Sequence, residues 1–247
     1  MIHVVLPAYN EEENIEATLQ EIWRRLETLA LSCRIVLVDD GSSDRTAALA
    51  QAGSRREHPV EVVSHGRNRG PGAAFRTGFL RVLEEAQASD IMLTLEADQT
   101  SDPRILMRLL HRIWEEGDDI ALASCYLYGG GIVGTRAHRV LLSHLANGLM
   151  KKSLGLTGLQ TLSSFYRAYS VAGLRRIHDH FGDRFMTSDG FECMVEILYR
   201  AARLGLRISE VPMQLDGSRR VGRSKMRVIG TSIAYLRLAA RAQLGRL

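Results

Sequence analysis

The sequence predicts an α/β fold built on a mostly parallel sheet with helices on both faces. Five short apolar runs recur between residues 2 and 124, and most are continuous, as expected of strands buried on both faces. Helical patterns separate these runs, which is typical of strand-helix-strand units with right-handed crossovers. The length of 247 residues and the hydrophobic content of 45% fit one large domain.

The expected strands cover residues 3–6, 34–38, 60–64, 91–95 and 120–123. A helix-start signal follows each of the first four strands. In chain order, these signals are Asn14 or Glu13, Ser43 or Asp44, the Gly70-Pro71-Gly72 turn, and Asp102-Pro103.

The strict alternation ends after the fifth strand. We expect a flexible loop at Gly129-Gly130-Gly131, a helix over 135–152 and an aromatic-containing stretch over 163–167. A helix over 189–204 then leads to a strand over 207–214. Residues 217–224 are rich in Gly, Ser and Arg and predict a mobile loop, and a last helix covers 226–244.

The net charge of +4 is unevenly distributed along the chain. From residue 216 onward, eight basic residues stand against one acid, so this segment carries +7 and the preceding residues carry −3. A basic tail on a mildly acidic body indicates a local anionic partner such as phosphate or an anionic membrane surface. Nucleic acid is not expected, because the basic loop has no interleaved aromatic residues for stacking.

The last helix is amphipathic. It places one apolar stripe on one face, made of Ile229, Ile233, Leu236, Ala240 and Leu244, and arginines on another. This pattern fits docking at a membrane surface, while packing on the domain or formation of a homo-oligomer explains the stripe equally well.

Cysteine usage and hydropathy predict the compartment. Cys33, Cys125 and Cys193 match neither a disulfide framework nor a zinc-ligand spacing, which favours a reducing cytosol. The first residues lack a secretory pattern, and no apolar run reaches about 18 residues. We therefore expect a cytoplasmic protein, with peripheral contact at the inner face of the cell membrane as the further hypothesis.

Two expected strands end in carboxylates. Glu96 and Asp98 flank Ala97, and carboxylates at this spacing lie on one face of a strand, from which they can turn toward a common ion. Such oxygen ligands suit Mg²⁺ or Mn²⁺ carrying a nucleotide diphosphate. The second acidic end is Asp39-Asp40-Gly41-Ser42-Ser43-Asp44. Each cluster alone would suit a polar turn, but two in one sheet predict a shared ligand crevice.

With these motifs in order, the chain resembles the family 2 glycosyltransferases of GT-A fold, and among them the polyprenyl (dolichyl) phosphate mannosyltransferases. The resemblance covers nearly the whole length. Its motifs are Pro7-Ala8-Tyr9-Asn10-Glu11, Asp39 to Asp44, Asn68-Arg69-Gly70-Pro71-Gly72-Ala73-Ala74, Glu96-Ala97-Asp98, Gly129-Gly130-Gly131, Arg139 with Ser143, and Arg219-x-x-Gly222-x-Ser224-Lys225.

The resemblance implies a single Rossmann-like GT-A domain over residues 1–225, followed by a basic amphipathic helix over 226–247. The nucleotide-binding half would cover about 1–124 and the acceptor half about 125–225. Two positions depart from the family pattern. Glu96 replaces the first Asp of the metal motif, and Cys125 stands where relatives commonly have Arg, which suggests a subgroup with another sugar or acceptor.

The resemblance also implies roles in binding a nucleotide-sugar donor. Asp39 or Asp40 would accept hydrogen bonds from the base or ribose, and Pro7, Ala8 and Glu11 would shape that pocket, with Gly70 and Ala97 beside the donor. Asp98 is the first choice as metal ligand, with Glu96 as its partner. The loop residues Arg219, Arg220, Ser224 and Lys225 would close over the diphosphate, because guanidinium groups suit phosphate oxygens.

The acceptor expected from the resemblance is a polyprenyl phosphate. A phosphate monoester is already anionic near neutral pH, so it needs positioning and no general base. Arg139 and Ser143, at i and i+4 of one helix, would hold it. If the acceptor were a hydroxyl, Asp189 and Glu192 would be the candidate bases, although both also suit the start of a helix. A non-catalytic nucleotide-binding relative is the remaining alternative.

Overall fold

The computed structural model describes residues 1–222 and 228–247, and the side chains of these residues except 138, 139, 228 and 229. Its elements are, in chain order, β1 Ile2–Ala8, α1 Ile15–Thr28, β2 Cys33–Asp39, α2 Thr46–Gly53, β3 Val60–Ser64, α3 Pro71–Glu85, β4 Ile91–Thr94, η1 Pro103–Ile105, α4 Leu106–Trp114, β5 Ile120–Ser124, β6 Gly131–Val133, α5 Ala137–Leu154, β7 Arg167–Ser170, α6 Val171–Phe181, η2 Gly182–Arg184, α7 Cys193–Arg203, β8 Ile208–Pro212, β9 Gln214–Asp216 and α8 Val228–Gln243.

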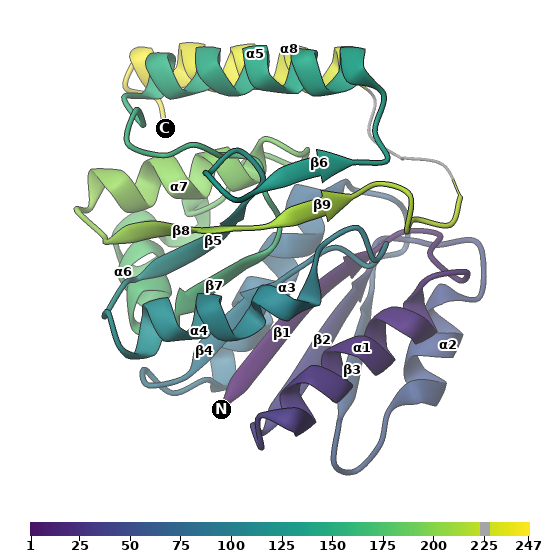
Figure 1. The fold of residues 1–247 in the computed structure, drawn as a ribbon. Coiled ribbons are helices and arrows are strands. Elements are labelled where there is room, and N and C mark those ends of the chain that lie inside the picture. Colours follow the sequence, from purple (N-terminus) through teal and green to yellow (C-terminus); the bar gives the residue numbers. More distant parts are fainter. Residues whose placement is uncertain (223–227) are drawn as a thin grey trace.

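The central sheet confirms the predicted fold class. It has seven strands in the order β3-β2-β1-β4-β7-β5-β8, and every pairing is parallel except those of β7 with β4 and β5 (Figure 1). The five predicted strands correspond to β1 through β5. Sequence reasoning missed β7, because a four-residue strand is too short to show a period and its place depends on both neighbouring strands.

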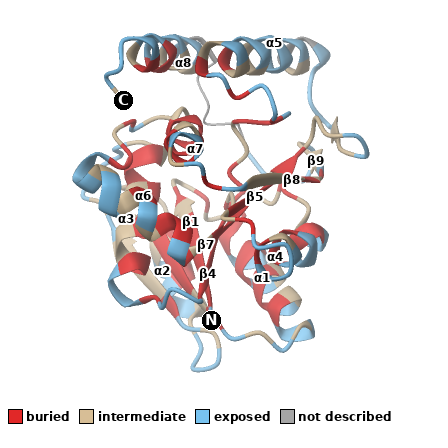
Figure 2. Cartoon of the chain, turned by 90° about the vertical axis from the view of Figure 1, so that its left-hand side faces the viewer, coloured by how far each residue is buried: buried red, intermediate tan, exposed pale blue. Residues whose placement is uncertain are grey.

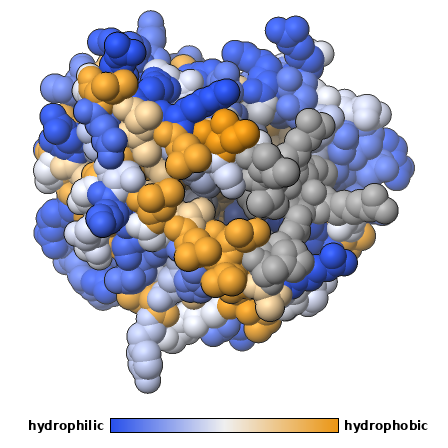
Figure 3. All heavy atoms as spheres, turned by 90° about the horizontal axis from the view of Figure 1, so that it is seen from above, coloured by the Kyte–Doolittle hydropathy of each residue, from blue (hydrophilic) through white to orange (hydrophobic). Residues whose placement is uncertain are grey.

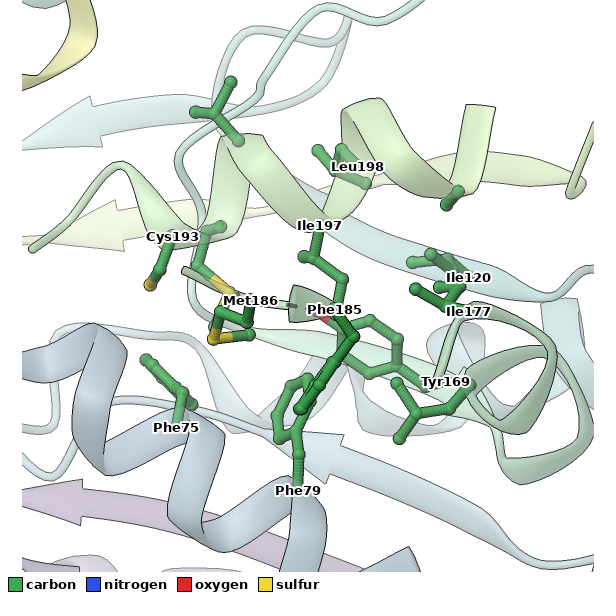
Figure 4. Packing of buried hydrophobic residues seen from close by; sticks show 14 of the residues in the cluster. Phe75, Phe79, Ile120, Tyr169, Ile177, Phe185, Met186, Cys193, Ile197 and Leu198 are labelled. Carbon is green, nitrogen blue, oxygen red and sulfur yellow. Dashed lines mark hydrogen bonds between the residues drawn. The ribbon is translucent and has the colours of Figure 1, made fainter. Parts of the chain in front are cut away.

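Both faces of the sheet are buried, as the continuous apolar runs predicted (Figure 2). Alternate residues of β1 point to opposite sides, so Val5 joins one core cluster while Val4 and Leu6 join the other. The first cluster packs α3, α6 and α7 on the sheet, and the second packs α1, α2 and α4. Figure 4 shows the first cluster, where Phe79 meets the ring of Tyr169 edge-on at 5.4 Å between centroids.

Several predicted boundaries need correction. The expected loop at 129–131 ends in a strand, because Gly131 begins β6, which pairs with β9. The predicted strand over 207–214 corresponds to β8, on the central sheet, which ends at Pro212, and Gln214 already begins β9, on the small sheet. The second helix begins at Thr46 with Arg45 at its N-cap, since the carboxylate of Asp44 accepts instead from the backbone N–H of Thr46, two residues on.

Helices α5 and α8 pack against each other as a separate layer above α7 (Figures 1 and 2). Helix α8 buries Leu238, Ala239 and Ala242 in the first core cluster. The stripe that the sequence singled out is therefore not the face that packs on the domain: Ile233 and Leu236 are 45% and 54% exposed. Among the described residues, no helix has the length and apolar character needed to cross a membrane.

Candidate active site

The carboxyl ends of β1, β2 and β4 meet at one edge of the sheet, where they border a cavity of about 940 Å³. Its acidic end is lined by Glu11, Asp40, Glu96 and Asp98 together with Arg220. Its other end extends between α5, α7 and α8, where it is lined by apolar residues such as Leu142, Met150, Phe165, Phe191 and Val195. One continuous space thus joins a charged region to a hydrophobic one.

Asp98 lies at the acidic end with both carboxylate oxygens engaged. Oδ1 accepts hydrogen bonds from the backbone N–H and the hydroxyl of Thr100, at 3.1 and 2.7 Å. Oδ2 accepts from Nε of Arg220 at 2.7 Å and is also paired with the terminal nitrogen of that guanidinium. The structure therefore brings together two residues that lie 122 positions apart in the sequence.

Glu96 faces the same end of the cavity, and its Oε2 accepts a hydrogen bond from the hydroxyl of Ser101 at 2.7 Å. Burial, followed by repulsion from Asp98, raises the pKa of this carboxyl to about 7, although Arg220 opposes the rise. A closely spaced pair of carboxylates is stabilised by a cation. Arg220 supplies a positive charge to this pair in the structure.

These two residues fit a hard divalent cation. Two carboxylates leave the remaining coordination positions to phosphate oxygens and water, which is how Mg²⁺ is commonly bound. Within residues 1–222 and 228–247, no cluster of three or more His, Cys, Asp or Glu side chains offers an all-protein metal site. Cys125 lines the cavity and burial raises the pKa of its thiol to about 11, but sulfur is a soft ligand that suits a hard cation such as Mg²⁺ poorly.

The two carboxylates at the end of β2, Asp39 and Asp40, occupy different positions. Asp40 lines the cavity, but it accepts from the backbone N–H groups of Arg69 and Gly70 and is 2.7 Å from Nδ1 of His65. It thereby holds the turn that opens α3. Asp39 is 5% exposed, does not line the cavity and accepts from the backbone N–H of Ser42 at 3.1 Å.

Some of the remaining predicted donor residues line the cavity and others do not. Pro7, Ala8, Glu11 and Ala97 line the cavity. Gly70 lies in the turn below it with φ +95°, and a Cβ at this position would lie 2.4 Å from the carbonyl oxygen of Asp189. Arg219 does not line the cavity, and Ser224 and Lys225 lie outside the described residues.

Of the predicted acceptor residues, Ser143 lies in the cavity wall on α5. The side chain of Arg139, one turn earlier, is outside the described part of the chain. Neither Asp189 nor Glu192 lines the cavity, and Asp189 forms an ion pair with Arg76 at 2.8 Å. Helix α7 begins only at Cys193, so Glu192 is its N-cap and Asp189 precedes the helix, whereas the sequence predicted a helix from 189.

Sequence reasoning missed one residue of the cavity wall, Tyr126, and one that supports the wall from behind, Arg167. Tyr126 donates its hydroxyl hydrogen to Ser143 at 2.6 Å, and its place two residues after β5 is a signal that could have identified it. Arg167 is fully buried and donates to the backbone carbonyls of Leu162, Ser164 and Met194. It therefore fixes the segment 162–165 that lines the cavity, a role that no local pattern indicates.

Known proteins resemble this chain in sequence and in fold. The profile of Glycosyl transferase family 2 matches residues 3–178. Polyprenol monophosphomannose synthase of Mycolicibacterium smegmatis is 31% identical over 245 residues, covering 99% of this chain and 88% of the relative. Undecaprenyl-phosphate mannosyltransferase of Micrococcus luteus is also 31% identical, covering 90% and 86%.

Solved structures show the same fold at lower sequence identity. Glucosyl-3-phosphoglycerate synthase from Mycobacterium tuberculosis, solved with Mn²⁺, UDP and phosphoglyceric acid, superimposes with a TM-score of 0.68 at 21% identity, covering all of this chain and 78% of that one. This likeness confirms the fold expected from the sequence. The profile match over most of the length, joined to relatives that cover nearly all of the chain, shows that this protein belongs to glycosyl transferase family 2 and has the GT-A fold.

Proposed function

We propose that this glycosyltransferase moves a sugar from a nucleoside diphosphate sugar to a polyprenyl phosphate, with a divalent cation bound by Glu96 and Asp98. One observation carries the proposal: a single cavity joins the acidic strand ends to an apolar region between α5, α7 and α8. A charged donor and a lipid acceptor need these two environments side by side. The relatives named for transfer to polyprenyl phosphates support the acceptor class.

The acidic end would bind the donor. Pro7 and Ala8 at the end of β1 and Glu11 in the following loop form its wall, and Asp40 holds the neighbouring turn in place. A cation on Glu96 and Asp98 would neutralise charge on the departing diphosphate, a Lewis-acid effect of several kcal/mol. Arg220 is close enough to contact the same phosphates, since its guanidinium already reaches Asp98. A protein of this fold has been solved with Mn²⁺ and UDP.

The acceptor phosphate would lie near Ser143 and Tyr126, between the two ends of the cavity. Its oxygen forms a bond to the anomeric carbon while the bond from that carbon to the diphosphate breaks, and the nucleoside diphosphate leaves with the electron pair. The configuration at the sugar carbon is then inverted. No base is required, because the attacking phosphate is already ionised near neutral pH.

A hydroxyl acceptor is the second candidate from the sequence. It would need a carboxylate or histidine close to the attacking oxygen. Asp189 and Glu192 were the candidate bases, but neither lines the cavity and Asp189 is paired with Arg76. The carboxylates that do line the cavity are assigned to the cation and to the donor pocket, so the phosphate acceptor is the one we propose.

The surface of the α5 and α8 layer fits a lipid acceptor. We define the α5–α8 face by its exposed apolar side chains: Leu141, Leu142, Leu145, Leu149, Ile233, Leu236 and Leu244. Exposed basic residues accompany it, namely Arg136, Lys152, Arg237 and Arg246. Figure 3 shows the apolar side chains gathered on this side of the molecule with hydrophilic ones around them. Apolar residues flanked by cations are typical of a surface that rests on an anionic membrane.

The experiment measures transfer of labelled sugar from UDP-, GDP- and dTDP-sugars to a short-chain polyprenyl phosphate and, in parallel, to the matching polyprenol. We expect transfer to the phosphate alone, loss of transfer with chelator, and recovery with Mg²⁺ or Mn²⁺. Transfer to the polyprenol would contradict the proposed acceptor, and full turnover in chelator would contradict the metal.

Asp98→Asn tests the assigned ligand directly. We expect turnover to fall at least about 100-fold, because the substitution removes a negative charge from the cation site. Asp102→Asn is the matched control, since Asp102 caps η1 through the backbone N–H of Arg104 and does not line the cavity. Equal losses in the two variants would contradict the assignment of Asp98.

A further inference from the structure

Asn14 connects the first turn of α1 to the basic loop 207 residues later. It is the N-cap residue of α1, yet its side chain does not cap the helix. Instead, Nδ2 donates to the carbonyl oxygen of Val221 at 3.1 Å and Oδ1 accepts from the backbone N–H of Val221 at 3.2 Å. Asn14 is 2% exposed, so its carboxamide is buried while it makes both contacts.

The same carboxamide also contacts the donor pocket. Nδ2 of Asn14 donates to Oε2 of Glu11 at 2.8 Å, and Glu11 lines the cavity. One turn further along α1, the hydroxyl of Thr18 lies 2.9 Å from the carbonyl oxygen of Ala97, between the two candidate metal ligands. The first turn of α1 thus fixes the loop after β1, the carboxylate pair and the basic loop relative to one another.

Only an amide side chain can make this set of contacts. It must donate to Val221 and to Glu11 and accept from Val221, which uses both hydrogens and the oxygen of a carboxamide. A carboxylate in its place could only accept, and it would repel Glu11. The consequence reaches Arg220, because docking Val221 fixes the residue before it, whose guanidinium lies on Asp98.

We propose that Asn14 is a positioning residue that docks Val221, so that Arg220 stays on Asp98 as its counter-cation until a nucleoside diphosphate offers that guanidinium another anionic partner. As long as no nucleotide is bound, Arg220 competes with a divalent cation for Oδ2 of Asp98. A bound diphosphate removes the competition, so each ligand strengthens the binding of the other. The inference rests on the proposed function, because it takes Glu96 and Asp98 as the cation ligands.

The test titrates Mn²⁺ into the full chain and follows unbound Mn²⁺ by electron paramagnetic resonance, first alone and then with saturating UDP or GDP. We expect Arg220→Gln to bind Mn²⁺ alone at least about fivefold more tightly than the wild type. A factor of this size is at the low end of the coupling commonly measured between two ligand sites. Asn14→Ala should shift the affinity in the same direction. In both variants, nucleotide should improve Mn²⁺ affinity by a smaller factor than in the wild type.

Arg219→Gln is the matched control, because it removes the same charge one residue away, and Arg219 does not line the cavity. It should change the affinity for Mn²⁺ alone by less than about twofold, as expected of a screened surface charge. A general folding defect would weaken Mn²⁺ binding, so tighter binding distinguishes a positioning role from a structural one. Thermal unfolding of each variant checks that it is folded.

The outcomes separate this inference from the function on which it rests. If the wild type binds Mn²⁺ and nucleotide but Arg220→Gln leaves the affinity for Mn²⁺ alone unchanged or weaker, the competition is overturned while the proposed function stands. If only Asn14→Ala has no effect, the positioning role of Asn14 is overturned. If the wild type binds neither Mn²⁺ nor nucleotide, the proposed function and this inference both fail.

Discussion

The residues that follow β2 and β4 owe their properties to partners that lie far away in the sequence. Asp40 is held by backbone groups of residues 69 and 70, and Asp98 by Arg220. From the sequence, either Asp39 or Asp40 could have been the residue that contacts the donor. The structure distinguishes them, because only one of two consecutive side chains at a strand end can turn toward the crevice.

Glu96 gives rise to a prediction on pH dependence. Its pKa is raised from an ordinary 4.5 to about 7, chiefly by burial, so folding favours the protonated form. Its contribution to stability is present below pH 4.5 and is lost as the pH rises through 7. We expect the stability of the wild type, relative to Glu96→Gln, to fall by about 1–3 kcal/mol between pH 4.5 and 8.

Urea unfolding in EDTA across this pH range measures the effect of Glu96. Asp102→Asn serves as the control. Burial by itself would raise the pKa of Asp102, but the hydrogen bonds from Arg104 hold this pKa below its ordinary 3.8, outside the pH range of the experiment. Its stability curve should run parallel to that of the wild type. Parallel curves for Glu96→Gln and the wild type would contradict the raised pKa.

At the scale of elements, the position of α3 depends on close contact with the loop before α7. Gly72 lies in the first turn of α3, and its backbone N–H donates to the carbonyl oxygen of Asp189 at 2.8 Å. A Cβ on Gly72 would lie 2.1 Å from the carbonyl oxygen of Ser188. Pro71 and Ala74, on the same helix, line the cavity, so this contact places part of the donor wall.

Gly72→Ala should therefore lower the free energy of unfolding by about 1–3 kcal/mol, the usual cost of overpacking, and weaken nucleotide binding. Gly148→Ala is the matched control on α5, where an added Cβ would meet no atom within 4 Å. It should raise stability by up to about 1 kcal/mol, because alanine is the better helix former. Chemical denaturation and nucleotide titration measure both, and equal stabilities of the two variants would refute the contact.

At the scale of the whole molecule, the layer of α5 and α8 closes the apolar end of the cavity and turns the α5–α8 face outward. Leu141, Leu145 and Leu149 recur every four residues along α5, so they form one stripe beside the exposed residues of α8. A contiguous apolar surface of this kind indicates an interaction site.

Vesicle co-sedimentation tests this surface. We expect the wild type to bind vesicles containing anionic phosphatidylglycerol more tightly than neutral ones, and the double variant Leu145→Ser with Leu236→Ser to bind at least about tenfold more weakly, given the energy of burying leucine. Met107→Ser, on α4, removes a comparably exposed apolar side chain elsewhere and should bind as the wild type does. A wild type that is dimeric in solution, with a monomeric double variant, would assign the face to a second copy instead.

Much of the fold could be predicted because local patterns encode it. Continuous apolar runs identified β1 to β5, and the sequence placed both acidic clusters at strand ends, where parallel strands put ligand sites. The strands that escaped prediction are β7, β6 and most of β9, each of three or four residues, and the helix α6 was not predicted either. Such short strands are defined by the neighbours with which they pair, so their own residues carry little signal.

The sequence by itself determined the α/β class, the family resemblance and the carboxylates that end two strands, because periodicity and spacing are properties of neighbouring residues. Only the tertiary structure decided that Arg220 meets Asp98, that Asn14 docks Val221, and that the apolar stripe of α8 faces outward. Each of these depends on which segments the fold brings within hydrogen-bonding or packing distance, and such contacts between segments far apart in the sequence leave no periodic trace in the chain.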